Sequence, residues 1–130
     1  MGVNAKPVLT ETFVAGASLA AAQYHFVKLN ANRQVILTAA DTDKPIGVLQ
    51  NKPASGEAAE VMVIGRTPVV SAEALTYGSS INPDASGHAE VCTIGTDTTK
   101  YNCGQVVEAS TAATEYAVAE INCANPGRGA

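Results

Sequence analysis

The sequence predicts an all-β domain, small and barrel-like, with an extended N-terminal arm and at most one or two short helices. Short apolar segments rich in Val, Ile and Thr recur along the chain, as they do in β-strands. Clusters of Gly, Pro, Asn, Asp and Ser separate these segments, which is typical of the turns of barrels and sandwiches. The chain has 130 residues and a mass of 13.3 kDa, so it has room for one domain and not for two.

The first twelve residues show neither helical nor clean strand periodicity, and we expect them to form an extended arm over residues 1–12. An arm without a core of its own either remains a disordered terminus or docks on another surface, and the sequence leaves both open. The β-rich domain is expected over residues 13–124. The Gly-containing end of the chain, residues 125–130, is predicted to be a flexible tail.

The expected strands follow one another in short steps. Asn30–Asn32 has the composition of a hairpin turn between the first two strands of the domain, and Asp41–Pro45 forms the next loop. A turn rich in Pro, Ser and Gly at 51–57 leads into the most strongly β-branched segment of the chain. The strands predicted around these turns are 24–29, 33–38, 45–50 and 59–65, the last of which continues through 67–70.

The second half of the chain contains the one segment with a helical pattern. Pro68 restricts its strand to an edge or a bulge, because proline cannot donate a ladder hydrogen bond. Residues 71–77 are compatible with two helical turns that begin at Ser71 as N-cap and end at Gly78. The remaining predicted strands are 88–93, 104–108 and 116–121.

One spacing occurs twice. Gly47 opens a strand–turn–strand unit whose first matched valine, Val61, follows fourteen positions later. Gly104 opens a second unit in which Val118 follows at the same spacing. The match is loose, so it predicts a repeated structural device and does not establish a duplication.

The charge of the chain excludes one large class of partners. The formal net charge is −4 and the pI is near 5.0, whereas a nucleic-acid binder needs clustered Lys and Arg to neutralise phosphates. No stretch approaches the roughly 18 apolar residues of a membrane span. Phe13–Ala22 resembles a weak signal peptide, but Glu11 precedes it and Gly16 interrupts it. We therefore expect no direct contact with nucleic acid or membrane.

The residues that carry chemistry in enzymes form no recognisable motif here. The three cysteines, Cys92, Cys103 and Cys123, lack a CxxC spacing and are predicted to be small buried hydrophobes. His88 and Cys92 are four positions apart, which in a strand separates them too far for a catalytic pair. The loop that carries Asp41 and Asp43 has too few oxygen ligands for calcium. We predict no enzymatic activity, no metal and no cofactor.

The order of the small-residue segments resembles the head-decoration, or capsid cement, proteins of tailed bacteriophages. The resemblance covers roughly residues 13–122 and depends on Gly, Ala and Val positions in a set order. The segments that carry it are Phe13–Leu29, Ile46–Leu49, Ala54–Glu57, Val61–Gly65, Leu75–Gly87 and Gly104–Ser110.

The resemblance implies a β-tulip fold and a homotrimer that sits on the outer surface of the virion after assembly in the host cytoplasm. It implies that the protein bridges subunits of the major capsid protein and so cements the shell. Proteins of this family commonly attach through an N-terminal arm, which can add a strand to a sheet edge of the capsid. The arm residues to which this role is assigned are Val3, Lys6, Pro7, Val8, Leu9, Thr10 and Thr12.

A second function stays open at this point. The domain is also compatible with a recognition module, an adhesin or fibre-tip domain that binds a carbohydrate or protein receptor. The chain has no Trp, which counts against a sugar site built on aromatic stacking. Tyr24, Phe26 and Tyr77 are the large side chains that could anchor a partner, and we expect them to fill the core instead.

Overall fold

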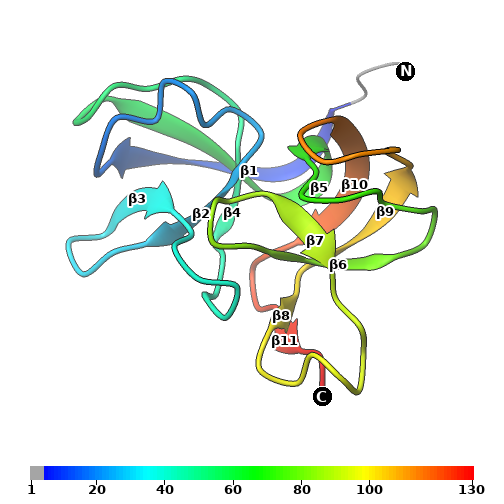
Figure 1. The fold of residues 1–130 in the computed structure, drawn as a ribbon. Coiled ribbons are helices and arrows are strands. Elements are labelled where there is room, and N and C mark those ends of the chain that lie inside the picture. Colours follow the sequence, from blue (N-terminus) through cyan, green and yellow to red (C-terminus); the bar gives the residue numbers. More distant parts are fainter. Residues whose placement is uncertain (1–4) are drawn as a thin grey trace.

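The computed structural model describes residues 5–130 and contains eleven strands and no helix in that part of the chain (Figure 1). The predicted all-β class is confirmed, and no helix of residues 5–130 could span a membrane. The strands are β1 (Lys6–Ala15), β2 (Phe26–Leu29), β3 (Gln34–Leu37), β4 (Gly47–Leu49), β5 (Ala58–Val70), β6 (Ser80–Pro83), β7 (Ala89–Val91), β8 (Tyr101–Asn102), β9 (Gly104–Glu108), β10 (Tyr116–Asn122) and β11 (Gly127–Arg128).

Nine strands form one mixed sheet in the order β1-β3-β2-β4-β5-β10-β9-β6-β7. Because β1 also pairs with β5, the first five strands of this order close into a ring, the small barrel that the sequence predicts. Its one parallel pair joins β1 to β3. The remaining four strands of this sheet, β10, β9, β6 and β7, extend from β5 as an antiparallel half, on the right of Figure 1. This half is called the second sheet below.

Strand β5 is the element that joins the two halves. Its first part pairs with β1 and β4 in the ring, and from Ile64 onward it pairs with β10. Gly65 lies where it passes from one half to the other, with φ of 143°, and a Cβ there would lie 2.6 Å from the carbonyl oxygen of Lys6. Beyond Arg66, β5 pairs with β10 alone among the described strands, so Pro68 occupies an edge as predicted.

Two cores result because strand side chains alternate between faces. In β2 and β4, Val27 and Leu49 point into the ring, whereas Phe26 and Val48 pack toward the second sheet. The ring core consists of Ala15, Leu19, Ala22, Val27, Val35, Leu49, Ala59 and Val61. The second core consists of Phe26, Val48, Met62, Val63, Val69, Leu75, Ile81, Ala89, Cys103, Val106, Ala117, Ala119, Ile121 and Cys123.

The three aromatic side chains that were considered as anchors, Tyr24, Phe26 and Tyr77, differ in their surroundings. Phe26 is fully buried, as expected. Tyr24 is partly buried and packs edge-on against Tyr116, with ring centroids 5.7 Å apart. Tyr77 is 76% exposed, so the expectation that it fills the core is wrong.

The helical interpretation of residues 71–77 is also wrong. Ser71 forms a bridge with Ala89, and Leu75 forms one with Ser110. The Ser71 hydroxyl donates to carbonyl oxygens in the 112–115 turn and caps no helix. Leu75 is fully buried, and its N–H and C=O both bond to Ser110, so long-range pairing replaces the local helical bonds.

The end of the chain, expected to be a flexible tail, is paired in the structure. Strand β11 pairs with β8 in a separate two-stranded sheet. Gly129 donates its N–H to the carbonyl of Lys100 (2.9 Å) and accepts from Gly95 (2.7 Å). Small residues allow this docking, since a Cβ at Gly129 would lie 2.6 Å from the Asp97 carbonyl oxygen.

Candidate interaction surface

Strand β1 has both faces in solvent along most of its length. Its residues from Lys6 to Thr12 are all exposed, and Val8 is 77% exposed. This explains why residues 6–12 lack a strand periodicity: no face of this segment is buried, so no alternation of apolar and polar residues is needed. Six of the seven residues assigned to capsid attachment lie together on this strand: Lys6, Pro7, Val8, Leu9, Thr10 and Thr12. The seventh, Val3, lies outside the described residues.

One edge of β1 is paired and the other is open. The paired edge runs along β5 from Lys6 to Val14, with register shifts around Val8 and Leu9. The opposite edge meets β3 only at Val14 and Ala15, and the described residues provide no backbone partner there for the rest of the strand.

The hydrogen bonds at the end of β1 show which residues face the open edge. Ala15 donates its N–H to the residue that precedes β5 (2.9 Å), and Gly16 donates to Val35 of β3 (2.8 Å). Successive residues of a strand direct their backbone groups to opposite edges. Thr12 and Thr10 therefore direct their backbone N–H and C=O groups to the β3 side, where these groups can pair with an added strand.

The other end of the sheet is protected in a way that β1 is not. Along the outer side of β7, Ala72 donates its N–H to the carbonyl of Ala89 (2.8 Å). The Glu73 carboxylate accepts the N–H of Val91 (3.1 Å). Folded proteins usually cover or charge a sheet edge in this manner because an open edge recruits other chains. The open edge of β1 lacks such protection and is thus suited to a partner strand.

A groove adjoins this edge, with a volume of about 770 Å³. Val14 and Leu29 are 45% and 44% exposed there, so an apolar side chain of a partner strand would find apolar contacts. The residues that line the groove are Glu11, Thr12, Phe13, Val14, Leu29, Asn32, Arg33 and Ala58.

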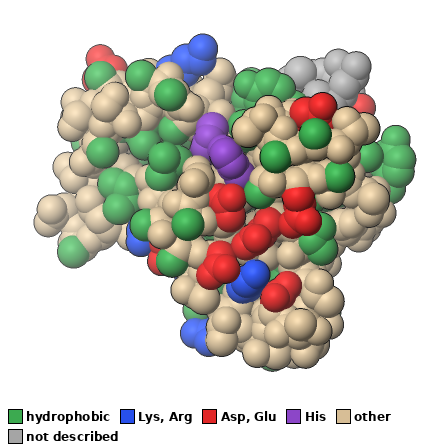
Figure 2. Space-filling model, in the orientation of Figure 1, with side chains coloured by type: hydrophobic (Ala, Val, Ile, Leu, Met, Phe, Trp, Pro, Cys, Tyr) green, Lys and Arg blue, Asp and Glu red, His purple; other side chains and the backbone are tan. Residues whose placement is uncertain are grey.

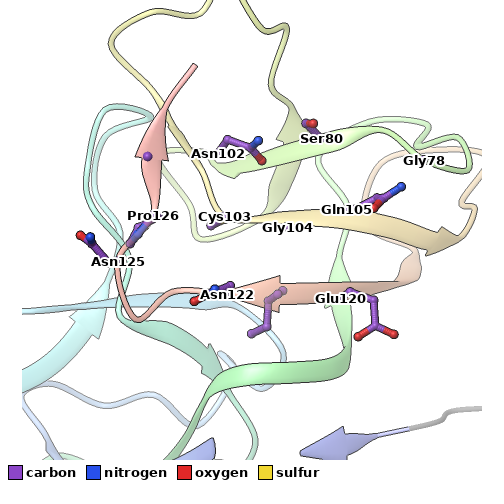
Figure 3. A pocket seen from close by; sticks show the side chains of 12 residues that line it. Gly78, Ser80, Asn102, Cys103, Gly104, Gln105, Glu120, Asn122, Asn125 and Pro126 are labelled. Atoms are coloured by element: carbon purple, nitrogen blue, oxygen red, sulfur yellow. The ribbon is translucent and has the colours of Figure 1, made fainter. Parts of the chain in front are cut away.

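A second cleft, of about 600 Å³, lies between the ends of β8, β9 and β10 and the loop before β11 (Figure 3). Glu120 is its single carboxylate, and one of its oxygens accepts from Arg66 Nε at 2.7 Å. Four amide side chains line it, so the cleft can hydrogen-bond uncharged polar groups and holds no pair of acidic residues for acid–base catalysis. The amides belong to Asn102, Gln105, Asn122 and Asn125.

All three cysteines are buried, as predicted. Burial raises the pKa of the Cys92 thiol, and the Asp97 carboxylate raises it further. Burial also raises the pKa of Cys103 well above its usual value, and the neighbouring Cys123 thiol adds to this. A nucleophilic cysteine needs a lowered pKa and access to solvent, so neither thiol is suited to that role.

The two acidic residues of the 39–45 loop make different contacts. The Asp43 carboxylate accepts the N–H groups of Ala39 and Ala40 and lies 2.8 Å from Lys28 Nζ. Asp41 instead lies 3.5 Å from Lys100 Nζ. Within residues 5–130 no group of His, Cys, Asp and Glu has the arrangement of a metal site.

Sequence reasoning missed the groove beside β1, because its walls come from segments far apart in the chain. Leu29 ends β2, Arg33 lies in the following turn, and Ala58 begins β5. A solvent-facing Leu at the end of a short strand was the one local signal.

The sequence matches no protein-family model and no curated protein. The fold is similar to the crystal structure of the N base of head fiber gp8.5 in bacteriophage phi29, with a TM-score of 0.64 and 15% sequence identity. The similarity covers 88% of this chain and 93% of that chain, so it includes both the ring and the second sheet. The chain therefore shares its fold with the base domain of a bacteriophage head fibre.

Proposed function

We propose that this protein is a structural component of a tailed-bacteriophage head that decorates the outer capsid surface. The observation that carries the proposal is the fold similarity to a head-fibre base, which spans nearly the whole of both chains. In this proposal the protein bridges neighbouring subunits of the major capsid protein and stabilises the shell. It performs no catalysis, which agrees with the raised thiol pKa values and the single carboxylate of the amide-lined cleft.

The open edge of β1 is the proposed site of attachment. The family resemblance implied an arm that adds a strand to a sheet edge of the capsid, but β5 already occupies one edge of this segment. A strand of the capsid protein would therefore pair along the other edge, at Thr10 and Thr12, by β-strand addition. Exposed Val8 would then be covered, and the groove beside β1 would receive an apolar side chain.

We further propose that the protein acts as a homotrimer. Its low content of charged residues, 15%, permits subunit contacts, because the core of an interface is depleted of charge. Size-exclusion chromatography with light scattering should give three times the 13.3 kDa mass of one chain. A monomer at high concentration would contradict the trimer without bearing on attachment to the capsid.

A binding assay with expanded and immature shells tests the function. The protein should cosediment with expanded shells and raise the temperature at which they release DNA, and it should not bind immature shells. If it binds neither form of any tailed-phage shell, the proposed function is wrong.

Point substitutions at the open edge test the site. Deletion of residues 1–12 is unsuitable, because it would also remove the pairing partner of β5. Thr10→Pro removes an N–H on the open edge only, and should weaken shell binding by at least about tenfold. Thr10→Val keeps this N–H and should bind like the parent protein.

A second pair of variants covers the possibility that Thr10→Pro does not fold. Val8→Glu places a charge on the exposed edge and should weaken binding, because charged edges resist strand addition. Val8→Thr is its matched control. Unchanged shell binding by folded Thr10→Pro or folded Val8→Glu would exclude the β1 edge as the attachment site.

A further inference from the structure

Besides the continuous strand β5, a tight joint holds the two halves of the molecule together, and it consists of the β6–β7 turn (residues 84–88) and the facing ends of β2 and β3. Phe26 donates its N–H to the carbonyl of Gly87 (2.7 Å), and the Thr38 hydroxyl donates to the carbonyl of Asp84 (2.9 Å). Gly87 has φ of 79°, and a Cβ there would lie 2.9 Å from the Phe26 carbonyl oxygen and from the Leu37 side chain. The joint therefore depends on close backbone contact.

Both histidines of the chain lie at this joint, one from each half. His25 precedes β2 in the ring, and His88 precedes β7 in the second sheet. Their ring centroids are 4.8 Å apart with an interplanar angle of 50°. Figure 2 shows the two side chains in contact on one face of the molecule.

Few charged groups face this pair. On the ring side, His25 Nδ1 is 3.0 Å from the carbonyl oxygen of Gln23, an uncharged partner. On the side of the second sheet, His88 Nδ1 is 3.9 Å from the carboxylate of Asp84. The same carboxylate also accepts the N–H groups of Ser86 and His88. Asp84 can thus balance one positive charge on the histidine pair. If both histidines were charged, one positive charge would remain without a balancing negative charge.

The surroundings of His25 favour its neutral form. Burial lowers the pKa of His25, and a positive charge on His88 lowers it further. The carbonyl groups of Gln23 and Ala22 and the charge of Asp84 act in the opposite direction without reversing this result. An opened joint, in which His25 is solvated, therefore binds more protons than the closed one.

We propose that the joint is an acid-sensitive latch: in mildly acidic solution, positive charge on both histidines drives the β6–β7 turn away from β2, while the two cores stay folded. Because the opened form binds more protons, the closed form loses stability as the pH falls through the ordinary range of histidine titration. The latch is independent of attachment to a capsid.

Amide hydrogen exchange followed by mass spectrometry at pH 7.5 and pH 5.5 tests this proposal. After correction for the intrinsic pH dependence of exchange, peptides that cover Phe26 and residues 84–88 should exchange several-fold faster at the lower pH. Peptides from the core of β10, at Val118 and Ala119, should keep their rates. Equal rates at the joint at both pH values would overturn the latch, and so would a uniform increase along the whole chain.

Substitution of the histidines separates the latch from general acid effects. The chain contains two histidines, so the double variant His25→Gln/His88→Gln removes all histidine titration and should abolish the pH effect on the joint. An unchanged effect in the double variant would overturn the proposal. The single variant His88→Gln gives a second readout by NMR: the His25 titration midpoint should rise, because its charged neighbour is gone. A midpoint that does not move would also overturn it.

Discussion

The backbone of Gly47 lies directly against the carbonyl oxygen of Met62 on the neighbouring strand β5, with no room for a side chain between them. Gly104 has the same relationship to β10, where a Cβ would lie 2.6 Å from the carbonyl oxygen of Glu120. Each of the two glycines thus lies in a strand that packs its backbone closely against the next long strand, but the matched valines do not occupy equivalent positions: Val61 pairs with Leu49, and Val118 pairs with Glu108.

Gly47→Ala should destabilise the protein by about 1–3 kcal/mol, the usual cost of forcing extra atoms into a packed core. Urea unfolding followed by circular dichroism measures this change. Gly127→Ala is the matched control, because a Cβ at that position meets no atom within 4 Å. Equal stabilities of the two variants would mean that the strand contact at Gly47 relaxes freely.

Lys100 joins three acidic residues from different segments, and its replacement should reveal their repulsion. Its Nζ is 3.5 Å from Asp41, 3.6 Å from Glu90 and 3.5 Å from Asp97. Burial acts to lower the pKa of Lys100, but the three carboxylates outweigh it and raise that pKa. Lys100→Gln should lower the free energy of unfolding by about 1 kcal/mol at low salt.

The stability that Lys100→Gln loses relative to the parent protein should decrease as NaCl is added, because salt screens charges near the surface. Lys52→Gln is a suitable control, since Lys52 has no ion pair in the described part of the chain. Thermal unfolding of both variants at 20 mM and 500 mM NaCl gives the comparison. A deficit that does not depend on salt would indicate lost packing of the Lys100 stem.

Asp43 should contribute to acid unfolding. Burial alone would raise its pKa, but hydrogen bonds from Lys28, Ala39 and Ala40 outweigh it and lower the pKa below the usual value. A lowered folded-state pKa gives stability that is present above the unfolded-state value of about 3.9 and is lost as the pH falls through the folded-state value. Between about pH 5 and pH 3, Asp43→Asn should therefore lose less stability than the parent protein. Urea midpoints across this range measure the difference, and identical pH profiles would contradict it.

The three cysteines should resist alkylation in the folded protein. Cys92, Cys103 and Cys123 are buried, and two of the thiols have a raised pKa, so little thiolate is available at pH 7.5. Mass spectrometry after mild iodoacetamide treatment should find less than one adduct per native chain and three adducts in 8 M urea. Selective modification of one native thiol would instead identify a reactive site.

Much of the fold could be predicted because its signals are local. Turn residues and β-branched segments mark where strands end and begin, so the elements from β2 to β5 appear close to their predicted ranges. The burial of the cysteines follows from their small apolar character. Residues 71–77 show the opposite case: a weak helical pattern yields to bridges with Ala89 and Ser110, which no local signal encodes.

By itself, the sequence determined the all-β class, the turns, the edge position of Pro68 and the lack of an acid–base or metal motif. These properties depend on the preferences of single residues and on short spacings. The tertiary structure alone decided that β1 closes the ring with an open outer edge, that the tail docks on β8, and that His25 meets His88. Each of these is a contact between segments far apart in the chain, and its free energy depends on what surrounds both partners after folding.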